Sequence, residues 1–290
     1  MPEPVTLNQA FVGAAAVLRE AGMATPELDA RLLLCHAAGL SHEAYVAGAG
    51  GPVQPATLAR FGTAIDRRLK REPVARITGT REFYGRGFTI APPALDPRPD
   101  TETLIEAALA LVERRGWRDQ TLSLLDLGTG TGCILVTLLA ELPRAQGLGT
   151  DLSPSALALA AANAVRLGVG SRAAFMAADW LDGIDGKFDL VLSNPPYLAS
   201  GEIAGLAPEV AAYDPMLALD GGPDGLDAYR RIAAGAPKVL AEGGRLLVEI
   251  GAGQAAQVSD IFRAARLKLD PSQAISRDLA GRPRVVACGL

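Results

Sequence analysis

The sequence contains few aromatic residues, few cysteines and no long apolar run. Phe, Trp and Tyr make up 5% of its 290 residues. Its three cysteines, Cys35, Cys133 and Cys288, stand far apart and form no CxxC pair, so we expect neither a metal site nor a disulfide framework. A run of about 18 apolar residues, which a membrane-spanning helix requires, is also missing.

A secretory signal is missing too, because the amino terminus carries Glu3 and no basic segment followed by an apolar run. These absences predict a cytoplasmic protein with no membrane partner, and we expect it to be a monomer. Positive charge is limited as well, since 28 Lys and Arg against 32 Asp and Glu give a net charge of −4. Proteins that coat nucleic acid usually carry a basic excess, so a stable nucleic-acid complex is not expected.

One local concentration of positive charge departs from this balance. It comprises Arg67, Arg68, Lys70, Arg71 and Arg76. Such a run is most often the solvated face of a helix, and the alternative is a surface that contacts a substrate. The sequence leaves both interpretations open.

The chain does contain enough apolar residues for a core, with 49% hydrophobic and 21% charged residues, and its length favours two domains or one large one. Residues 1–75 have apolar residues at helical spacing and helix starts at Thr25-Pro26 and Ser41, which predicts a small helical bundle. Residues 76–99 are predicted to form a linker, with a β-hairpin built from residues 77–79 and 83–90. Its second half is stiffened by Pro92, Pro93, Pro97 and Pro99.

Residues 100–290 alternate between predicted strands and helices, beginning with a helix that Asp100 is expected to cap. The predicted strands span residues 122–127, 146–150, 173–177, 188–192, 245–250 and 284–288. The clearest helix between them spans residues 153–167, with Ser153 as its cap. This alternation predicts an α/β domain with a doubly wound parallel sheet.

A glycine-rich turn, DLGTGTG, follows the first of these strands. Glycines let the backbone approach a ligand there, and the start of the next helix offers N–H groups. A dinucleotide fingerprint would need glycine where the sequence has Cys133, so a nicotinamide cofactor is the minority interpretation. The turn instead resembles the first motif of class I methyltransferases, which implies S-adenosylmethionine as cofactor. The implied contacts are Asp126, Gly128, Thr129, Gly130, Thr131 and Gly132.

Acidic residues follow the second and third predicted strands. Asp151 lies about 20 residues beyond the glycine turn, where a carboxylate can bind both ribose hydroxyls. Asp179 and Trp180 stand where the same fold binds adenine, so the acid can accept the exocyclic amine and the indole can form a flat wall. The alternative for this pair is a surface aspartate beside a packing tryptophan.

The fourth strand is followed by Asn194-Pro195-Pro196-Tyr197, and ligands of doubly wound sheets bind beyond such strand ends. An amide or aniline-like nitrogen is a poor nucleophile because its lone pair is delocalised. The side-chain oxygen of Asn194 and the carbonyl of Pro195 can each accept one N–H of such a nitrogen, which aims its lone pair and stabilises the positive charge that develops. Pro196 keeps the turn rigid, and Tyr197 can stack on the flat target group.

No general base is required, because an alkylated amide nitrogen loses its proton readily. His36 and His42 both lie in the predicted helical bundle, so we expect them to face solvent or to pack. A proline-stiffened turn without chemistry is the alternative for the NPPY segment.

Segments outside these motifs resemble the HemK/PrmC family of protein-(glutamine) methyltransferases. They are residues 73–79, 81–84, 97–102, 219–227, 249–251 and 281–284. One departure is Asp96, because the family usually has an apolar residue before the proline at this position. The likeness runs from the N-terminal helices to residue 284 and so covers nearly the whole chain.

The resemblance implies a Rossmann-like class I methyltransferase fold in residues 100–290, with an antiparallel terminal strand. It implies that residues 1–75 bind class I peptide chain release factors and that the catalytic domain methylates the glutamine of their GGQ motif. Asn194 to Tyr197 would hold that glutamine, and Asn194 would also contact the cofactor. The reaction would leave S-adenosylhomocysteine and support translation termination.

Three other functions stay open at this point. NPPY also occurs in methyltransferases of exocyclic adenine amines, although no basic groove or target-recognition insert is evident here. A glutamine methyltransferase of a ribosomal protein is a second alternative, although its glycine loop tends to be CTGSG where this chain has GTGTG. The third is a cofactor-binding module that interacts with translation proteins without catalysis.

Overall fold

The computed structural model describes residues 4–92 and 94–290, so Glu3 and Pro93 lie outside the described residues. The chain forms two compact units. The first, the helical unit, extends to Thr80 and also includes Pro208–Tyr213. The second, the catalytic unit, comprises Arg81–Ala207 and Asp214–Leu290. Among the described residues, no helix has the length and apolar character needed to cross a membrane.

The helical unit is a bundle, as predicted. Its helices are α1 (Leu7–Glu20), α2 (Pro26–Ala38), α3 (His42–Gly48), α4 (Pro55–Leu69), α5 (Val74–Thr78) and α9 (Pro208–Tyr213). Thr6 and Gln9 form a capping box at the start of α1, and the Ser41 hydroxyl accepts the N–H of Ala44 at the start of α3. Buried Leu18, Leu33 and Phe61 belong to its core.

The basic cluster is not a solvated helix face throughout. Arg68 is 7% exposed, and its Nε lies 2.7 Å from Oδ2 of Asp29 in α2. The same guanidinium contacts Oε1 of Glu209 in α9 at 3.3 Å. A buried charge needs such partners, so Arg68 holds α2, α4 and α9 together. Arg67 pairs with Glu72 instead, at 2.5 Å.

Two local predictions differ from the structure. Residues 77–79 belong mostly to α5, a short helix, and the hairpin consists of β1 (Thr80–Phe83) and β2 (Arg86–Thr89). Buried Ala75 and Ile77 pack this turn of helix in the helical unit, so that unit extends five residues beyond the predicted boundary at residue 75. Asp100 caps no helix: it lies within the 3-10 turn η1 (Pro99–Thr101), and its carboxylate pairs with Arg284 at 2.9 Å.

The catalytic unit contains an eight-stranded sheet with helices on both faces. The strands lie in the order β5 (Ala173–Ala177), β4 (Gln146–Asp151), β3 (Ser123–Leu127), β6 (Phe188–Ser193), β7 (Leu240–Glu249), β10 (Pro283–Gly289) and β8 (Lys268–Leu269), with β9 (Ile275–Arg277) also pairing with β10. Strands β3 to β7 are parallel and β10 is antiparallel to β7, which confirms the predicted fold.

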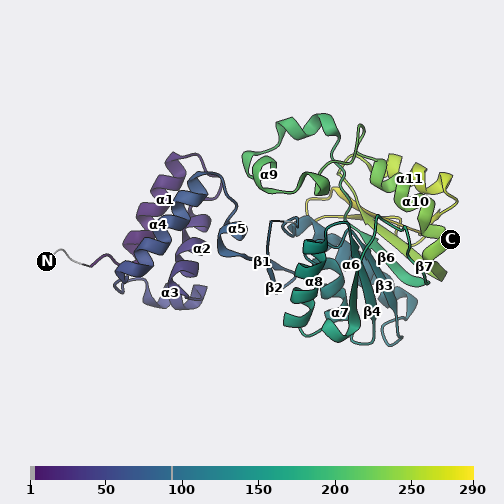
Figure 1. The fold of residues 1–290 in the computed structure, drawn as a ribbon, viewed down its shortest axis with the longest axis horizontal. Coiled ribbons are helices and arrows are strands. Elements are labelled where there is room, and N and C mark those ends of the chain that lie inside the picture. The colour runs from purple at the N-terminus through teal and green to yellow at the C-terminus, as the bar shows by residue number, and fades with distance from the viewer. Residues whose placement is uncertain (1–3, 93) are drawn as a thin grey trace. The chain divides into compact units, whose positions relative to one another are not determined.

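Helices cover both sides of this sheet (Figure 1). On one side lie α6 (Glu102–Arg115), α7 (Cys133–Glu141) and α8 (Pro154–Arg166); on the other lie α10 (Asp227–Val239) and α11 (Ala255–Ala264). Tyr229 of α10 and Phe262 of α11 are fully buried in one core cluster with Leu125 and Val248 of the sheet. Helices on both faces explain why the strands are apolar throughout.

The register of the strands places the predicted motifs side by side. Leu127 at the end of β3 pairs with Thr150 of β4 on one side and with Ser193 of β6 on the other. The chain therefore leaves three neighbouring strand ends at Gly128, Asp151 and Asn194. The strand order reverses between β3 and β6, and such a switch point is where doubly wound sheets bind ligands.

Candidate active site

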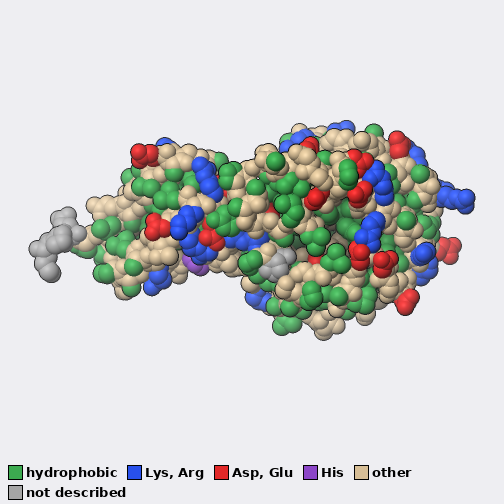
Figure 2. Space-filling view, turned by 45° about the horizontal axis from the view of Figure 1, so that its top comes forward, with side chains coloured by type: hydrophobic (Ala, Val, Ile, Leu, Met, Phe, Trp, Pro, Cys, Tyr) green, Lys and Arg blue, Asp and Glu red, His purple; other side chains and the backbone are tan. Residues whose placement is uncertain are grey.

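A cavity of about 900 Å³ lies in the catalytic unit at these strand ends. Figure 2 shows a hollow in the surface of this unit, bordered by hydrophobic side chains. Its volume is within the range of small-molecule and cofactor sites. Of the predicted site residues, the cavity is lined by Gly128, Thr129, Gly130, Thr131, Asp151, Asp179, Trp180, Asn194 and Pro196.

At Gly128 and Gly130, the glycine turn brings backbone without side chains to the cavity wall. Gly128, Gly130 and Gly132 have φ angles of +69°, +55° and +80°, a conformation that other residues adopt only with strain. A Cβ on Gly132 would also lie 3.1 Å from the Cβ of Ala160 in α8. Gly132 therefore packs the turn against α8 and does not itself line the cavity.

Asp126 supports the turn from below. It is fully buried, and its Oδ2 accepts a hydrogen bond of 2.6 Å from the hydroxyl of Thr129. Burial raises the pKa of Asp126 to about 7, although the hydrogen bond from Thr129 lowers it. Because Asp126 does not line the cavity, its direct contact with a cofactor stays a prediction.

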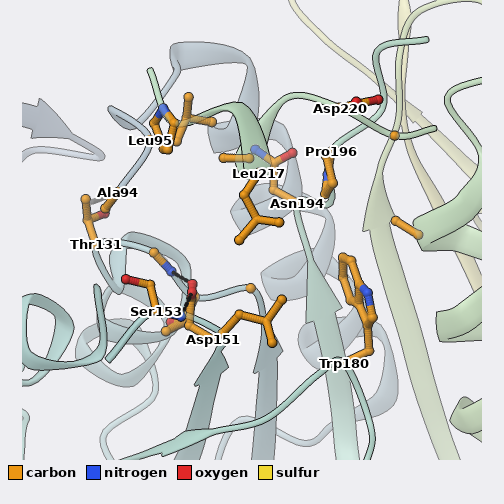
Figure 3. Close-up of a pocket in the computed structure, with 18 of the residues that line it drawn as sticks. Ala94, Leu95, Thr131, Asp151, Ser153, Trp180, Asn194, Pro196, Leu217 and Asp220 are labelled. Carbon is orange, nitrogen blue, oxygen red and sulfur yellow. Dashed lines mark hydrogen bonds between the residues drawn. The ribbon is translucent and has the colours of Figure 1, made fainter. Parts of the chain in front are cut away.

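Asp151 links the turn to the next strand. Its Oδ2 accepts the N–H of Gly130 at 2.9 Å, and its Oδ1 accepts the N–H of Ser153 at 2.9 Å (Figure 3). Each carboxylate oxygen can accept a further hydrogen bond. The carboxylate is therefore held in one orientation at the cavity wall and can still bind a pair of hydroxyl groups.

Asp179 and Trp180 both line the cavity, beyond the end of β5. Trp180 has a φ of +56°, a left-handed conformation in which its indole forms part of the wall (Figure 3). Asp179 accepts a hydrogen bond of 2.8 Å from Arg231 of α10, which the sequence did not indicate. A ligand amine that binds Asp179 must share the carboxylate with this guanidinium.

Asn194 lies at the centre of the site, with its side chain among the residues that line the cavity (Figure 3). Its Nδ2 donates a hydrogen bond of 3.0 Å to Oγ1 of Thr101. No described residue donates to its Oδ1. This polarity leaves the acceptor end of the amide available to an N–H group in the cavity.

The other members of NPPY differ in exposure to the cavity. Pro196 lines it, whereas Pro195 and Tyr197 do not. The Tyr197 carbonyl accepts a 2.9 Å hydrogen bond from Gln254, and burial raises the pKa of the Tyr197 phenol. Its ring packs against the core cluster below α10 and α11. Stacking of Tyr197 on a target group therefore stays a prediction.

Comparisons with known proteins agree with this geometry. Residues 9–79 match the family model of the PrmC N-terminal domain, and residues 106–210 match that of the methyltransferase small domain. The release factor glutamine methyltransferase of Cereibacter sphaeroides is 49% identical over 94% of this chain and 94% of its own length. That of Bradyrhizobium diazoefficiens is 48% identical over 94% of this chain and 91% of its length.

The chain belongs to the release factor glutamine methyltransferase family. Solved structures of lower identity share its fold. They include the hMettl16 catalytic domain in complex with MAT2A 3′UTR hairpin 6, with a TM-score of 0.58 and 16% identity over 77% of this chain and 82% of that one. A methyltransferase from Pyrococcus furiosus has a TM-score of 0.50 and 14% identity over 71% of this chain and 90% of that one.

The sequence did not identify several wall residues of this family member. The segment from Ala94 to Arg98 lines the cavity, as do Thr101 and the segment from Pro215 to Ala218. Residues 97–102 resemble the family's sequence, and this resemblance is the sequence signal for Thr101. His36 and His42 are exposed in the helical unit.

Proposed function

We propose that this enzyme transfers a methyl group from S-adenosylmethionine to the side-chain amide nitrogen of the glutamine in the GGQ motif of class I release factors. One observation supports the proposal most: Asn194 lines the cavity beside the glycine turn while its Nδ2 donates to Thr101, in a chain about half identical to release factor glutamine methyltransferases. The products are the methylated glutamine and S-adenosylhomocysteine.

The cavity suits this cofactor. Gly128 and Gly130 present backbone at its wall, where the methionine part can lie. Asp151 is oriented to accept the two ribose hydroxyls, and Trp180 offers a flat wall for the adenine. When bound, S-adenosylmethionine supplies an electrophilic methyl group on its sulfonium.

The protein acts on the glutamine by orientation and charge. Oδ1 of Asn194 accepts one N–H of the glutamine amide. We assign the second to the carbonyl of Pro195, which lies between Asn194 and Pro196 of the cavity wall without lining it itself. Two fixed acceptors turn the nitrogen lone pair toward the methyl group and stabilise the positive charge that grows on nitrogen. The methylated nitrogen then loses its proton without a dedicated base.

The helical unit provides the second part of the proposal. It matches the PrmC N-terminal domain model over residues 9–79 and contains no predicted site residue of the cavity. We assign to it the binding of the release factor, and we place the enzyme in the cytoplasm as a monomer. On the face drawn in Figure 2, Lys and Arg side chains are interspersed with acidic ones, which does not favour nucleic acid as the substrate.

A methyl-transfer assay tests this function. The full-length protein is incubated with radiolabelled S-adenosylmethionine and a class I release factor, and in parallel with the same factor carrying a substitution of its GGQ glutamine. We expect label in the first factor and none in the second. Equal labelling of both, or transfer of label to DNA or RNA instead, would contradict the proposal.

A further inference from the structure

Thr101 connects Asn194 to a buried carboxylate. Thr101 is 2% exposed, and its Oγ1 accepts the 3.0 Å hydrogen bond from Nδ2 of Asn194. The Thr101 hydroxyl also lies close enough to the Glu249 side chain to lower the pKa of that carboxyl. A hydroxyl has one hydrogen to donate. Nδ2 of Asn194 can only donate, so the Thr101 hydrogen is free for another acceptor, and the neighbouring Glu249 carboxylate can take it.

Glu249 ends β7, beside the strand that leads to Asn194. Ser193 of β6 pairs with Val248 of β7, so Asn194 and Glu249 follow adjacent positions of the two strands. Glu249 is 1% exposed, and its Oε2 has no hydrogen-bond partner among the described residues. Buried carboxylates are rarely left in this state without a role.

We propose that Glu249, acting through the hydroxyl of Thr101, is a positioning residue that keeps the Oδ1 end of the Asn194 amide facing the substrate glutamine. This inference rests on the proposed function. An ionised Glu249 only accepts hydrogen bonds, so Thr101 must donate to it and must accept from Nδ2 of Asn194. The amide oxygen is then the group that the cavity receives.

Protonation of Glu249 removes this constraint. A protonated carboxyl can donate to Oγ1 of Thr101, which frees the Thr101 hydrogen for Oδ1 of Asn194. The amide then turns by 180° about its last bond and presents Nδ2 to the cavity. Two N–H groups would face each other there, so the glutamine nitrogen is no longer held.

The surroundings of Glu249 place this change near neutral pH. Burial raises the pKa of Glu249 to about 7, with a further rise from Asp100 of η1, while the Thr101 hydrogen bond and Arg284 of β10 lower it. Arg284 is itself buried and lies 2.9 Å from Asp100. The other titratable groups that interact with Glu249 are Tyr197 after β6, Tyr229 of α10 and Cys133 of α7.

The pH profile of the full-length enzyme tests the relay. The quantity is kcat/KM for a class I release factor, measured at saturating S-adenosylmethionine so that titration of Asp126 under the glycine turn does not enter through cofactor binding. The kcat/KM of the wild type should rise about tenfold between pH 6 and pH 8, because the ionised fraction of a group with a pKa of about 7 rises by that factor. Glu249→Gln should show a flat profile.

Glu242→Gln is the matched control, since Glu242 lies exposed on the same strand. This variant should show the same rise of kcat/KM with pH as the wild type. An equal rise of kcat/KM in Glu249→Gln would overturn the proposal. Wild-type enzyme that labels no release factor at any pH would instead refute the proposed function, so the two failures are distinguishable.

A second pair of variants tests Thr101 without changing Glu249. Thr101→Ser keeps the hydroxyl and should retain kcat/KM within about threefold, whereas Thr101→Val should lose about 10- to 100-fold, the effect of a misplaced reacting group. The Kd for S-adenosylmethionine, measured by calorimetry, should be similar in both variants. Equal activity of the serine and valine variants would refute the relay.

Discussion

Replacement of Asn194 by alanine separates its role in catalysis from its role in stability. The substitution removes the side-chain oxygen of a residue that lines the cavity, the oxygen to which we assign one N–H of the glutamine. Loss of one such electrostatic contact to a transition state typically costs about 10²- to 10³-fold in rate, or about 2.7–4 kcal/mol. We therefore expect kcat for the release factor to fall by that factor.

The stability effect should be much smaller. Asn194→Ala breaks one neutral hydrogen bond to Thr101, which contributes about 1 kcal/mol. Thr101 loses only a donor to its oxygen, because in the proposed relay its own hydrogen still points to Glu249. No buried donor is left without a partner, so Tm should fall by only about 2–4 °C.

The assay combines initial rates of label transfer, a calorimetric Kd for S-adenosylmethionine and a thermal unfolding curve on the same preparation. We expect a measurable Kd, a near-native Tm and strongly reduced turnover. Turnover within about threefold of the wild type would refute the assigned role. A loss of activity that merely follows loss of folded protein would refute it as well.

Three further substitutions test the framework. Asn163→Ala should lower the unfolding free energy by about 3 kcal/mol in a denaturant titration, because it breaks three hydrogen bonds to the backbone, two with Thr89 and one with the Thr131 carbonyl; an unchanged midpoint would contradict this. Arg68→Met should destabilise the protein by about 3–5 kcal/mol, since it leaves the buried carboxylate of Asp29 without its guanidinium. A denaturation midpoint equal to that of the wild type would refute the assigned role. Because the pKa of Asp126 is raised in the folded state, its contribution to stability is present at low pH, and the free energy of unfolding falls by about 1.4 kcal/mol between pH 6 and pH 8. Asp126→Asn should remove this part of the pH dependence of the unfolding free energy. An unaltered pH dependence would count against it.

The catalytic unit was largely predictable because its signals are local. Apolar strands end at turns that only glycine or proline favours, as at Gly128 and Pro195, and all six predicted strands are present to within a few residues. A strand and a turn depend on neighbours in the sequence, so a pattern reveals them. The rule that parallel strands present their carboxyl ends together then placed Asp151 and Asn194 at one cavity.

Predictions that depended on solvent or on distant partners were less accurate. Arg68 belongs to a basic run that indicates a solvated face, yet the fold buries it between Asp29 and a residue 141 positions away, Glu209. Asp100 precedes a helix in the sequence, yet Arg284 draws its carboxylate to β10. Charged side chains are placed by whichever counter-ion the tertiary structure supplies.

By itself, the sequence determined the sheet, the glycine turn and the NPPY segment, because each depends on the conformations that its own residues allow. Only the tertiary structure decided which way the Asn194 amide points. That choice depends on the contact between Nδ2 of Asn194 and Thr101 and, in the proposed relay, on buried Glu249. These three residues come from separate parts of the chain. Hydrogen-bond direction and desolvation arise from spatial neighbours, and sequence spacing does not encode them.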